Sequence, residues 1–464
     1  TSALTVEDVQ KLSTTLKPPV SIFLNRTKFI VPREYRQRAG DMLENLFTQE
    51  EKKRIGWDWS QGRDEEPELK GEWLQNGTPT DSVVLYLHGG AYYICNYQIY
   101  RPFLSKLIKY SNCRTCAINY RLAPQRPFPS ALEDSLATYL YLIDPPEHTK
   151  AIDPKRIVIS GDSAGGGLTM ALLLAIRDAK LPLPAGGMPI SPWVDLTHSL
   201  PSILTNILTD FLPASGFKHA PSPALDYSQL PQRKQDTIAL EKAKKRAEKA
   251  KDEHKITVSE DDENRASIGP LSIPVPPSNS DEDMYRIQFY APNDALKLPM
   301  VSPIFDRRRL RGLPPLLIQC GKSERLRDES LYLSLEASGT FFNDEDKNDN
   351  GEPTQVTLEV YVDQPHVFQI MFISTKPTKR ATKNLASFVC EVTGSHLESP
   401  GYYLSDKLLS VKEICPKGKT VDATKDLLRY VDSNTWNEWK KRLNRPSIKE
   451  RMDEVTEFYN QLNK

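Results

Sequence analysis

A serine in a glycine-bounded turn is the side chain in this sequence best suited to nucleophilic chemistry. Residues 161–165 read Gly-Asp-Ser-Ala-Gly, with Ser163 at the centre. Residues 156–160 before them predict a short buried strand, and residues 164–179 after them predict a helix rich in Leu, Ala and Met. Such a tight strand–turn–helix holds the hydroxyl at the helix N-terminus, where peptide dipoles favour developing negative charge. We therefore predict that Ser163 is a nucleophile.

The serine hydroxyl needs a base to take its proton, and the sequence offers seven histidines. In folds that carry such a turn, the acid and the histidine follow the serine, which excludes His88 and His148. His366 follows an alternating strand predicted over residues 356–362 and is the expected base, while His396 lies in a Gly/Ser/Pro-rich stretch typical of a surface. Three others stand too close to the preceding motif or in polar, solvated stretches: His198, His219 and His254.

The acid that orients the histidine is expected on a strand end between these two residues. Residues 315–321 form an apolar strand running into a turn, and Glu324 and Asp328 follow it. A carboxylate here would hold the imidazole in one tautomer and stabilise its charged form. Both acids also suit the first turn of a helix. Spacing alone does not separate them.

A second glycine turn supplies candidate donors for an oxyanion. Residues 88–90 read His-Gly-Gly and come directly after the strand predicted over residues 83–87. Glycines leave their backbone N–H groups unshielded, so Gly89 and Gly90 are the expected donors, and the N–H of Ala164 is the third. Nearby aromatic residues are predicted either to shape an apolar substrate pocket or to pack in the core: Tyr92, Tyr93 and Trp193.

Together these motifs resemble the hormone-sensitive-lipase branch of the α/β-hydrolases, serine esterases with a His-Gly-Gly turn and a Gly-Asp-Ser-Ala-Gly-Gly elbow. The family's acid motif reads Asp-x-Leu-x-Asp, and its first Asp belongs to the triad. The stretch starting at Glu324 reads Glu-Arg-Leu-Arg-Asp here, so the resemblance favours Glu324 as the acid, with Asp328 as the fallback. The resemblance extends over residues 75–390 and includes further blocks at residues 120–124, 128–134, 191–196, 302–305 and 366–368.

The resemblance implies an α/β-hydrolase fold with a mostly parallel central sheet, flanking helices and a helical cap. It implies a carboxylesterase or lipase that acts on apolar esters, with short- to medium-chain acyl groups or acetylated lipids, through an acyl-enzyme. No metal or organic cofactor is expected. Two alternatives stay open: an amidase or deacetylase with the same triad, and a non-catalytic member of the fold that binds a small apolar molecule.

Length and composition fit one catalytic unit with additions. The 464 residues include 61 Lys+Arg and 61 Asp+Glu, and this zero formal net charge gives no reason to expect a nucleic-acid partner. We expect an N-terminal cap or lid segment over residues 1–75, a catalytic domain over 76–395 and a helical extension over 396–464. Within the catalytic domain, residues 211–284 predict a charged, flexible insertion, since its central helix-forming run has almost no apolar face.

Partners and compartment stay open at this stage. No run of 18 apolar residues predicts a membrane span, although the basic run of the insertion leaves lipid contact as an alternative to a solvated surface. The C-terminal extension is expected to pack on the catalytic domain or on a second subunit of a homodimer. The chain starts at Thr1, which leaves an upstream signal or anchor open, and Asn25 and Asn76 begin glycosylation tripeptides. A secretory or endomembrane location and a cytoplasmic one are therefore both open.

Overall fold

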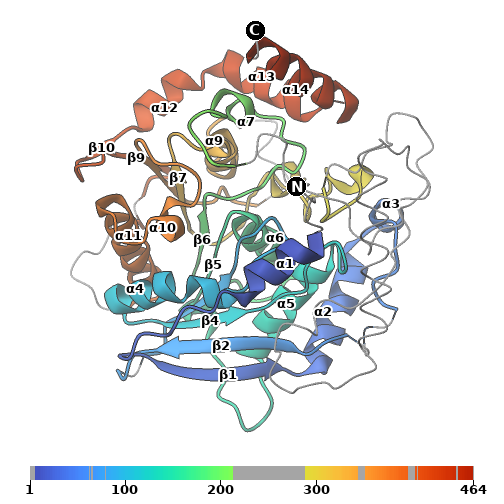
Figure 1. The fold of residues 1–464 in the computed structure, drawn as a ribbon, viewed down its shortest axis with the longest axis vertical. Helices are drawn as coiled ribbons and strands as arrows, with labels where there is room; N and C mark the ends of the chain where they lie inside the picture. The colour runs from blue at the N-terminus through green and yellow to red at the C-terminus, as the bar shows by residue number, and fades with distance from the viewer. Residues whose placement is uncertain are drawn as a thin grey trace.

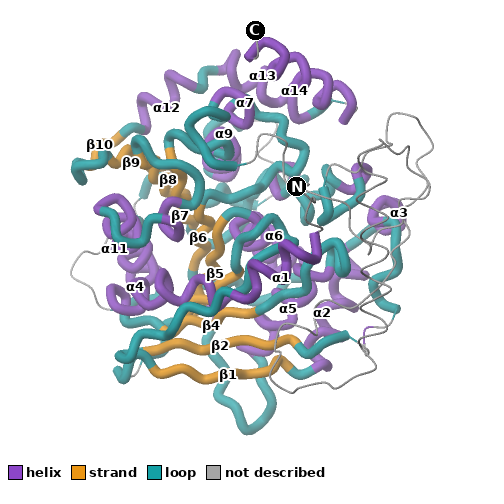
Figure 2. The backbone as a smooth tube through the Cα atoms, in the orientation of Figure 1, coloured by secondary structure: helices purple, strands orange, loops and turns teal. Residues whose placement is uncertain are grey.

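A ten-stranded sheet forms the centre of the protein. The structure is a computed structural model that describes residues 6–61, 63, 66–78, 80–212, 288–342, 351–395, 403–404, 406–445 and 448–462. The strand order is β1-β2-β4-β3-β5-β6-β7-β8-β9-β10. Figure 2 shows these strands as one continuous twisted sheet, from β1 at the bottom of the view to β10 at the upper left.

Seven neighbouring strands of the sheet, from β4 through β3, β5, β6, β7 and β8 to β9, run parallel. At the two edges, β1, β2 and β10 pair antiparallel. Every residue is buried in the five central strands β3, β5, β6, β7 and β8, as expected for parallel strands that are covered on both faces. The strands are β1 (Asn25–Val31), β2 (Leu69–Gln75), β3 (Val83–Leu87), β4 (Arg114–Ile118), β5 (Ile157–Asp162), β6 (Gly186–Ile190), β7 (Leu316–Gly321), β8 (Val356–Tyr361), β9 (Leu409–Ile414) and β10 (Thr420–Asp422).

Helices cover both faces of the sheet, so the predicted α/β class with a mostly parallel sheet is confirmed (Figure 1). Alternate side chains of β3 divide between two apolar clusters, one with α5 and α6 and the other with α4 and α11. The helices are α1 (Val6–Thr15), α2 (Arg33–Leu46), α3 (Gln49–Ile55), α4 (Arg101–Ser111), α5 (Ser130–Ile143), α6 (Ala164–Asp178), α7 (Ser202–Thr205), α9 (Arg327–Ala337), α10 (Phe368–Met371), α11 (Lys376–Val392), α12 (Thr424–Tyr430), α13 (Ser433–Leu443) and α14 (Ile448–Leu462).

The sheet extends past both ends of the segment predicted to carry it. Residues 1–75 were expected to precede the first core strand, yet β1 and β2 lie within them and pair from Asn25↔Gln75 to Val31↔Leu69. The extension over residues 396–464 is not purely helical either, because β9 and β10 come before α12. These edge strands lack a regular apolar alternation, with most of β1 exposed, so sequence periodicity does not reveal them.

The C-terminal helices pack on the body of the protein, one of the two arrangements expected for them. Trp436 of α13 stacks on Tyr332 of α9, with ring centroids 4.4 Å apart, and on Phe341 at 4.7 Å. Arg451 of α14 is buried and donates a hydrogen bond to the carbonyl of His198. The tail therefore contacts the loop that follows β6.

The charged insertion predicted over residues 211–284 lies outside the described residues, apart from Phe211 and Leu212. His219, His254 and His396 also lie outside them. Across the part of the chain that is described, no helix combines the length and apolar character needed to cross a bilayer.

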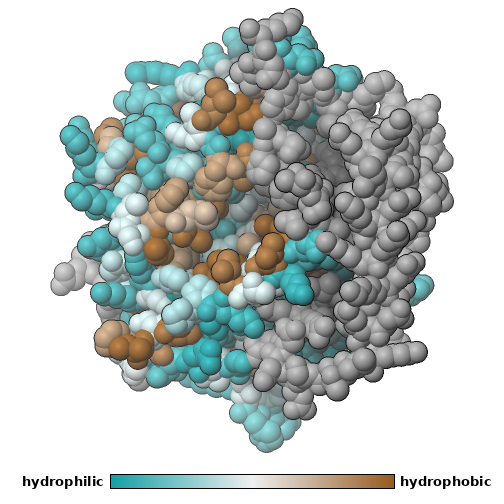
Figure 3. Space-filling model, viewed as in Figure 1, coloured by the Kyte–Doolittle hydropathy of each residue, from teal (hydrophilic) through white to brown (hydrophobic). Residues whose placement is uncertain are grey.

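The described surface carries scattered apolar patches among polar ones, and Figure 3 shows several of them on one face. Large apolar side chains that are more than half exposed come from helices and loops outside the sheet: Leu12, Leu16, Ile22, Phe23, Leu208, Met371 and Tyr430.

Candidate active site

Ser163 occupies a strained turn between the end of β5 and the start of α6, as the sequence predicts. Its backbone angles are φ 53° and ψ −120°, which few residues other than glycine adopt without strain. The flanking glycines leave no room for a side chain: a Cβ would lie 2.3 Å from the Gly165 carbonyl oxygen at Gly161, and 2.0 Å from the Leu87 carbonyl oxygen at Gly165. The turn therefore requires glycine on both sides of the serine.

His366 lies in the loop between β8 and α10, and its Nε2 is 2.9 Å from the Ser163 hydroxyl oxygen. The two residues are 203 positions apart in the chain, but β5 and β8 run parallel, so both stand at the carboxyl edge of the sheet. The ring is buried, and this burial lowers the pKa of His366 to about 4. At neutral pH the ring is therefore uncharged and can accept a proton.

Glu324 is the carboxylate that faces the other nitrogen of this ring. Its Oε2 lies 3.9 Å from His366 Nδ1, and the same oxygen accepts hydrogen bonds from the Ser191 hydroxyl at 2.7 Å and the Gly321 N–H at 3.0 Å. Burial raises the pKa of Glu324 well above its usual value, while these two donors lower it. Among the described residues, neither His366 Nδ1 nor Glu324 Oε1 has a hydrogen-bond partner, although both atoms are buried.

Asp328, the fallback acid, contacts a different set of residues. Its Oδ2 accepts a hydrogen bond from the Ser202 N–H at 2.9 Å, and its Oδ1 pairs with Arg327 at 2.8 Å. These contacts tie the first turn of α9 to α7. The structure thus brings Glu324, and not Asp328, up to the ring of His366.

The glycine turn after β3 lies beside Ser163, but Gly89 is not a free donor. Its N–H donates to Asp162 Oδ1 at 2.9 Å, so its assignment as an oxyanion donor is corrected. The turn continues through Gly90, whose φ of +111° and close approach to the Ile94 carbonyl exclude a side chain. Within the described structure, the N–H groups of Gly90, Ala91 and Ala164 form no hydrogen bond. These three amides are the available donors.

The aromatic residues predicted to shape a pocket are almost fully buried. Tyr92 stacks on Tyr290 with ring centroids 3.6 Å apart, and Tyr93 meets Phe289 edge-on at 5.3 Å. The backbone N–H of Trp193 donates to the Ser163 carbonyl at 2.9 Å. All three belong to the larger apolar cluster, which fits the alternative of core packing; contact with a substrate stays a prediction.

Two polar residues at the site were quoted in the sequence motifs without a role. Asp162 accepts hydrogen bonds from the hydroxyls of Tyr86 at 2.7 Å and Tyr100 at 3.2 Å, and burial raises its pKa to about 6. Ser191 donates to Glu324 and accepts from the Val367 N–H at 3.2 Å. The sequence could have indicated a role for both from their positions in the motifs: Asp162 directly precedes Ser163, and Ser191 directly follows β6.

A third residue, Asp210, had no sequence signal. Its carboxylate accepts hydrogen bonds from the backbone N–H groups of Arg325 and His366. It stands at the last described turn before the charged insertion, where nothing in the local pattern distinguishes it from a surface acid.

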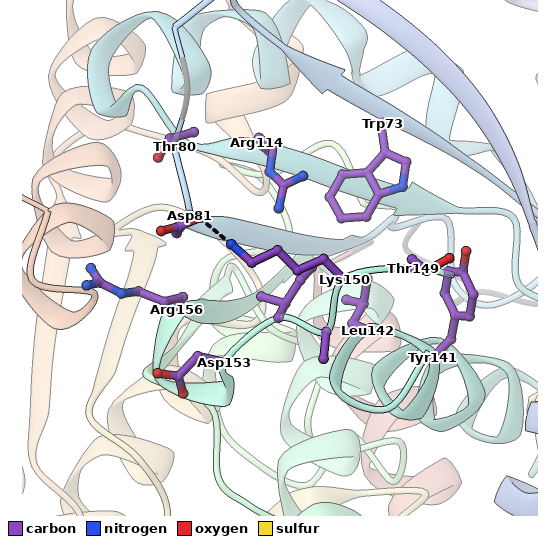
Figure 4. A pocket seen from close by; sticks show the side chains of 12 residues that line it. Trp73, Thr80, Asp81, Arg114, Tyr141, Leu142, Thr149, Lys150, Asp153 and Arg156 are labelled. Carbon is purple, nitrogen blue, oxygen red and sulfur yellow. Dashed lines mark ion pairs between the residues drawn. The ribbon is translucent and has the colours of Figure 1, made fainter. Parts of the chain in front are cut away.

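A separate pocket of about 530 Å³ lies away from this site (Figure 4). Asp81 precedes β3, Arg114 begins β4 and Arg156 precedes β5, so the pocket opens at the amino edge of the parallel strands. Lys150 points toward Asp81 across it, at 3.9 Å. None of the predicted site residues lines this pocket.

Part of the chain is similar to known sequences. A family described as having the alpha/beta hydrolase fold matches residues 84–223. An acetyl-hydrolase of Streptomyces hygroscopicus is 41% identical over 125 residues, which are 27% of this chain and 40% of that protein. A carboxylesterase/phospholipase, LipF, of Mycobacterium tuberculosis is 34% identical over 138 residues, 29% of this chain and 35% of that protein. The chain spans at most half the length of the first such curated relatives.

Solved structures cover far more of the chain. An esterase from the bacterial hormone-sensitive lipase family is 25% identical, with a TM-score of 0.54 over 85% of this chain and 94% of that chain. The esterase EstE5, soaked with p-nitrophenyl butyrate, is 24% identical, with a TM-score of 0.54 over 84% of this chain and 92% of that chain. This second likeness concerns the fold alone.

Proposed function

We propose that this chain, which belongs to the hormone-sensitive-lipase-like family of α/β-hydrolases, is a serine esterase that hydrolyses carboxylic esters. One observation carries the proposal: the hydroxyl oxygen of Ser163, on its strained backbone turn, lies 2.9 Å from Nε2 of the buried, uncharged imidazole of His366. A hydroxyl becomes a nucleophile when a base at this distance can take its proton.

In the proposed reaction, Ser163 attacks the ester carbonyl carbon and His366 Nε2 takes its proton. Glu324 orients the ring through Nδ1 and stabilises its positive charge, which requires the 3.9 Å separation to shorten to a hydrogen bond. The protonated ring then gives its proton to the leaving alkoxide, and an acyl-enzyme remains. Water, deprotonated by His366, hydrolyses this intermediate and restores Ser163.

Negative charge on the carbonyl oxygen is stabilised by backbone donors. The N–H groups of Gly90, Ala91 and Ala164 are the candidates, because each forms no hydrogen bond within the described residues. Gly90 and Ala91 belong to the glycine turn beside Ser163, and Ala164 directly follows Ser163. Ala164 is also the first residue of α6, where the helix dipole adds to the effect. The hydrogen bond from Gly89 to Asp162 holds this turn against the nucleophile elbow.

The proposed substrates are apolar esters with a short- to medium-chain acyl group, or acetylated lipids. The names of the relatives, acetyl-hydrolase and carboxylesterase/phospholipase, support this range without selecting within it. Contact with a lipid surface stays a prediction, because the basic run that suggests it lies outside the described residues. Homodimer formation also stays a prediction. Amide hydrolysis by the same triad and ligand binding without catalysis are the alternatives to exclude.

The test is a p-nitrophenyl ester series of increasing acyl length, run on wild type and Ser163→Ala, with a matched p-nitroanilide. We expect ester turnover that falls by at least about 10³-fold in Ser163→Ala, the scale seen when a triad is broken. A fluorophosphonate probe should label wild type and not the variant. Folded wild type that neither turns over any ester nor reacts with the probe would favour the binding alternative, and faster anilide cleavage would favour the amidase.

A further inference from the structure

One carboxylate connects the two loops that bring an acid and a base to the site. Asp210 lies beyond α7, and its Oδ2 accepts a hydrogen bond from the Arg325 N–H at 2.7 Å. Its Oδ1 accepts one from the His366 N–H at 3.1 Å. Arg325 adjoins Glu324, so the two oxygens of this side chain hold the acid loop on one side and the base loop on the other. Backbone N–H to carboxylate bonds are among the stronger hydrogen bonds in proteins.

The segment before Asp210 is itself anchored to the acid loop. The Asn206 side chain donates to the Glu324 carbonyl at 2.8 Å, and the Thr209 hydroxyl donates to the Ser323 carbonyl at 2.9 Å. These contacts fix Asp210 relative to residues 322–325, whereas its bond to His366 reaches across to a loop 156 residues along the chain. Asp210 is thus well placed to set the separation between the two loops.

This separation matters because Glu324 and His366 stand 3.9 Å apart and share no hydrogen bond. Small displacements of either loop would decide whether their contact forms. The negative charge of Asp210 also raises the pKa of His366, against the lowering effect of burial. The titratable and charged groups that act on this pair from the surrounding elements include Asp210, Cys320, Arg327 and Glu329.

We propose that Asp210 is a positioning residue for the reaction proposed above, holding the Glu324 and His366 loops in register and stabilising the imidazolium that forms when Ser163 attacks. The inference rests on the proposed function. No proton moves to or from Asp210: the proton of Ser163 goes to His366 Nε2 and then to the leaving group. Asp210 acts through its two backbone contacts and its charge.

The test is Asp210→Asn, with kcat and KM measured across pH on a p-nitrophenyl ester. An asparagine keeps the shape but loses the charge, and it offers one acceptor oxygen where two are needed. We expect kcat at pH 7.5 to fall at least about 10-fold with KM within about threefold, since misplaced reacting groups lower kcat. The acid limb of kcat/KM should move to lower pH, because losing the negative charge lowers the pKa of His366.

Glu391→Gln is the matched control. Glu391 also accepts hydrogen bonds from two backbone N–H groups of another segment, those of Tyr403 at 3.1 Å and Leu404 at 2.8 Å, but it lies at the end of α11 and outside the site. It should leave kcat and the acid limb unchanged. If Asp210→Asn matches Glu391→Gln in both readouts, the inference is wrong.

Two further measurements cover the remaining outcomes. If Asp210→Asn does not fold, Asp210→Glu restores the charge with altered geometry: a lowered kcat with an unmoved acid limb supports the inference, and wild-type kcat overturns it. If wild type shows no turnover, the proposed function fails on its own, and hydrogen exchange still tests the clamp. Faster exchange of both residues 322–327 and residues 364–368 in Asp210→Asn supports it, and unchanged exchange overturns it.

Discussion

Two buried polar clusters of this protein are built in opposite ways. In one, Asp134 of α5 accepts from the Arg36 side chain at 2.8 Å, and from the side chain and backbone N–H of Arg121 at 3.0 and 2.8 Å. In the other, His366 Nδ1 and Glu324 Oε1 are buried without hydrogen-bond partners among the described residues.

The difference separates a cluster that holds the fold from one suited to a reaction. Arg121 and Arg36 lower the pKa of Asp134 despite its burial, so the charges stay paired and tie α2 to α5 and the loop after β4. Burial instead keeps His366 neutral and raises the pKa of Glu324. Ionisable groups with such shifted pKa values are typical of catalytic sites. Breaking the first cluster should cost stability, and breaking the second should cost activity.

The largest effect is expected for His366→Ala. Removing the base should lower kcat/KM by about 10³-fold or more, as for other broken triads, since the ring contacts the serine directly. The thermal unfolding midpoint should stay close to that of wild type. Steady-state kinetics together with calorimetry check this. If the variant lost much of its stability but kept the kcat/KM of wild type, the two clusters would not differ in the way described.

Asp134→Ala should have the opposite profile. It removes the carboxylate that Arg36 and Arg121 share, although Arg121 still pairs with Glu133 at 3.3 Å. Because Arg36 is left buried without this partner, the change should cost about 3 kcal/mol of unfolding free energy. The fraction that remains folded should keep kcat within about threefold of wild type, because Asp134 does not contact the site. Urea unfolding and active-site titration measure the two quantities. A lowered kcat per titrated site would show that the clusters are coupled.

Glu324→Gln tests which carboxylate of the site acts on His366. It should lower kcat/KM by about 100-fold, because a neutral side chain no longer stabilises the imidazolium. Asp328→Asn is the paired control, since Asp328 binds Ser202 and Arg327 instead. It should lower kcat/KM less than about fivefold. The assignment of the acid would be reversed if Asp328→Asn were the more damaging of the two.

The smallest effect concerns pH. His366 must be neutral to accept a proton, and burial lowers its pKa to about 4, so activity should persist as pH falls below 6.5 and decline only nearer that lower value. A kcat/KM profile between pH 3.5 and 9, with folding checked at each pH by fluorescence, tests this. An acid limb at or above 6.5 would show that the ring is not buried during the reaction.

Much of the site could be predicted from the sequence because its parts carry local signals. The elbow at Ser163 needs glycines on both sides, and the strand before His366 alternates in a regular way. The position of Ser163 then narrowed the choice of base, because the histidine follows the serine along the chain in folds with such a turn. The edge strands β1, β9 and β10 carried no such signal, since their exposed and half-buried residues follow no clear period. Gly89 was assigned wrongly because the sequence does not show which acceptor an N–H group meets.

The amino-acid sequence predicted Ser163 as nucleophile and located the two glycine turns, because these depend on residues that are neighbours along the chain. It predicted His366 as base and the α/β fold class from the order of several motifs and their resemblance to a known family. The three-dimensional fold was needed to place Glu324, and not Asp328, near the ring, to pair the Gly89 N–H with Asp162, and to bring Asp210 between two loops. These depend on distances between segments more than 40 residues apart, which the parallel sheet sets when it gathers its carboxyl strand ends at one edge.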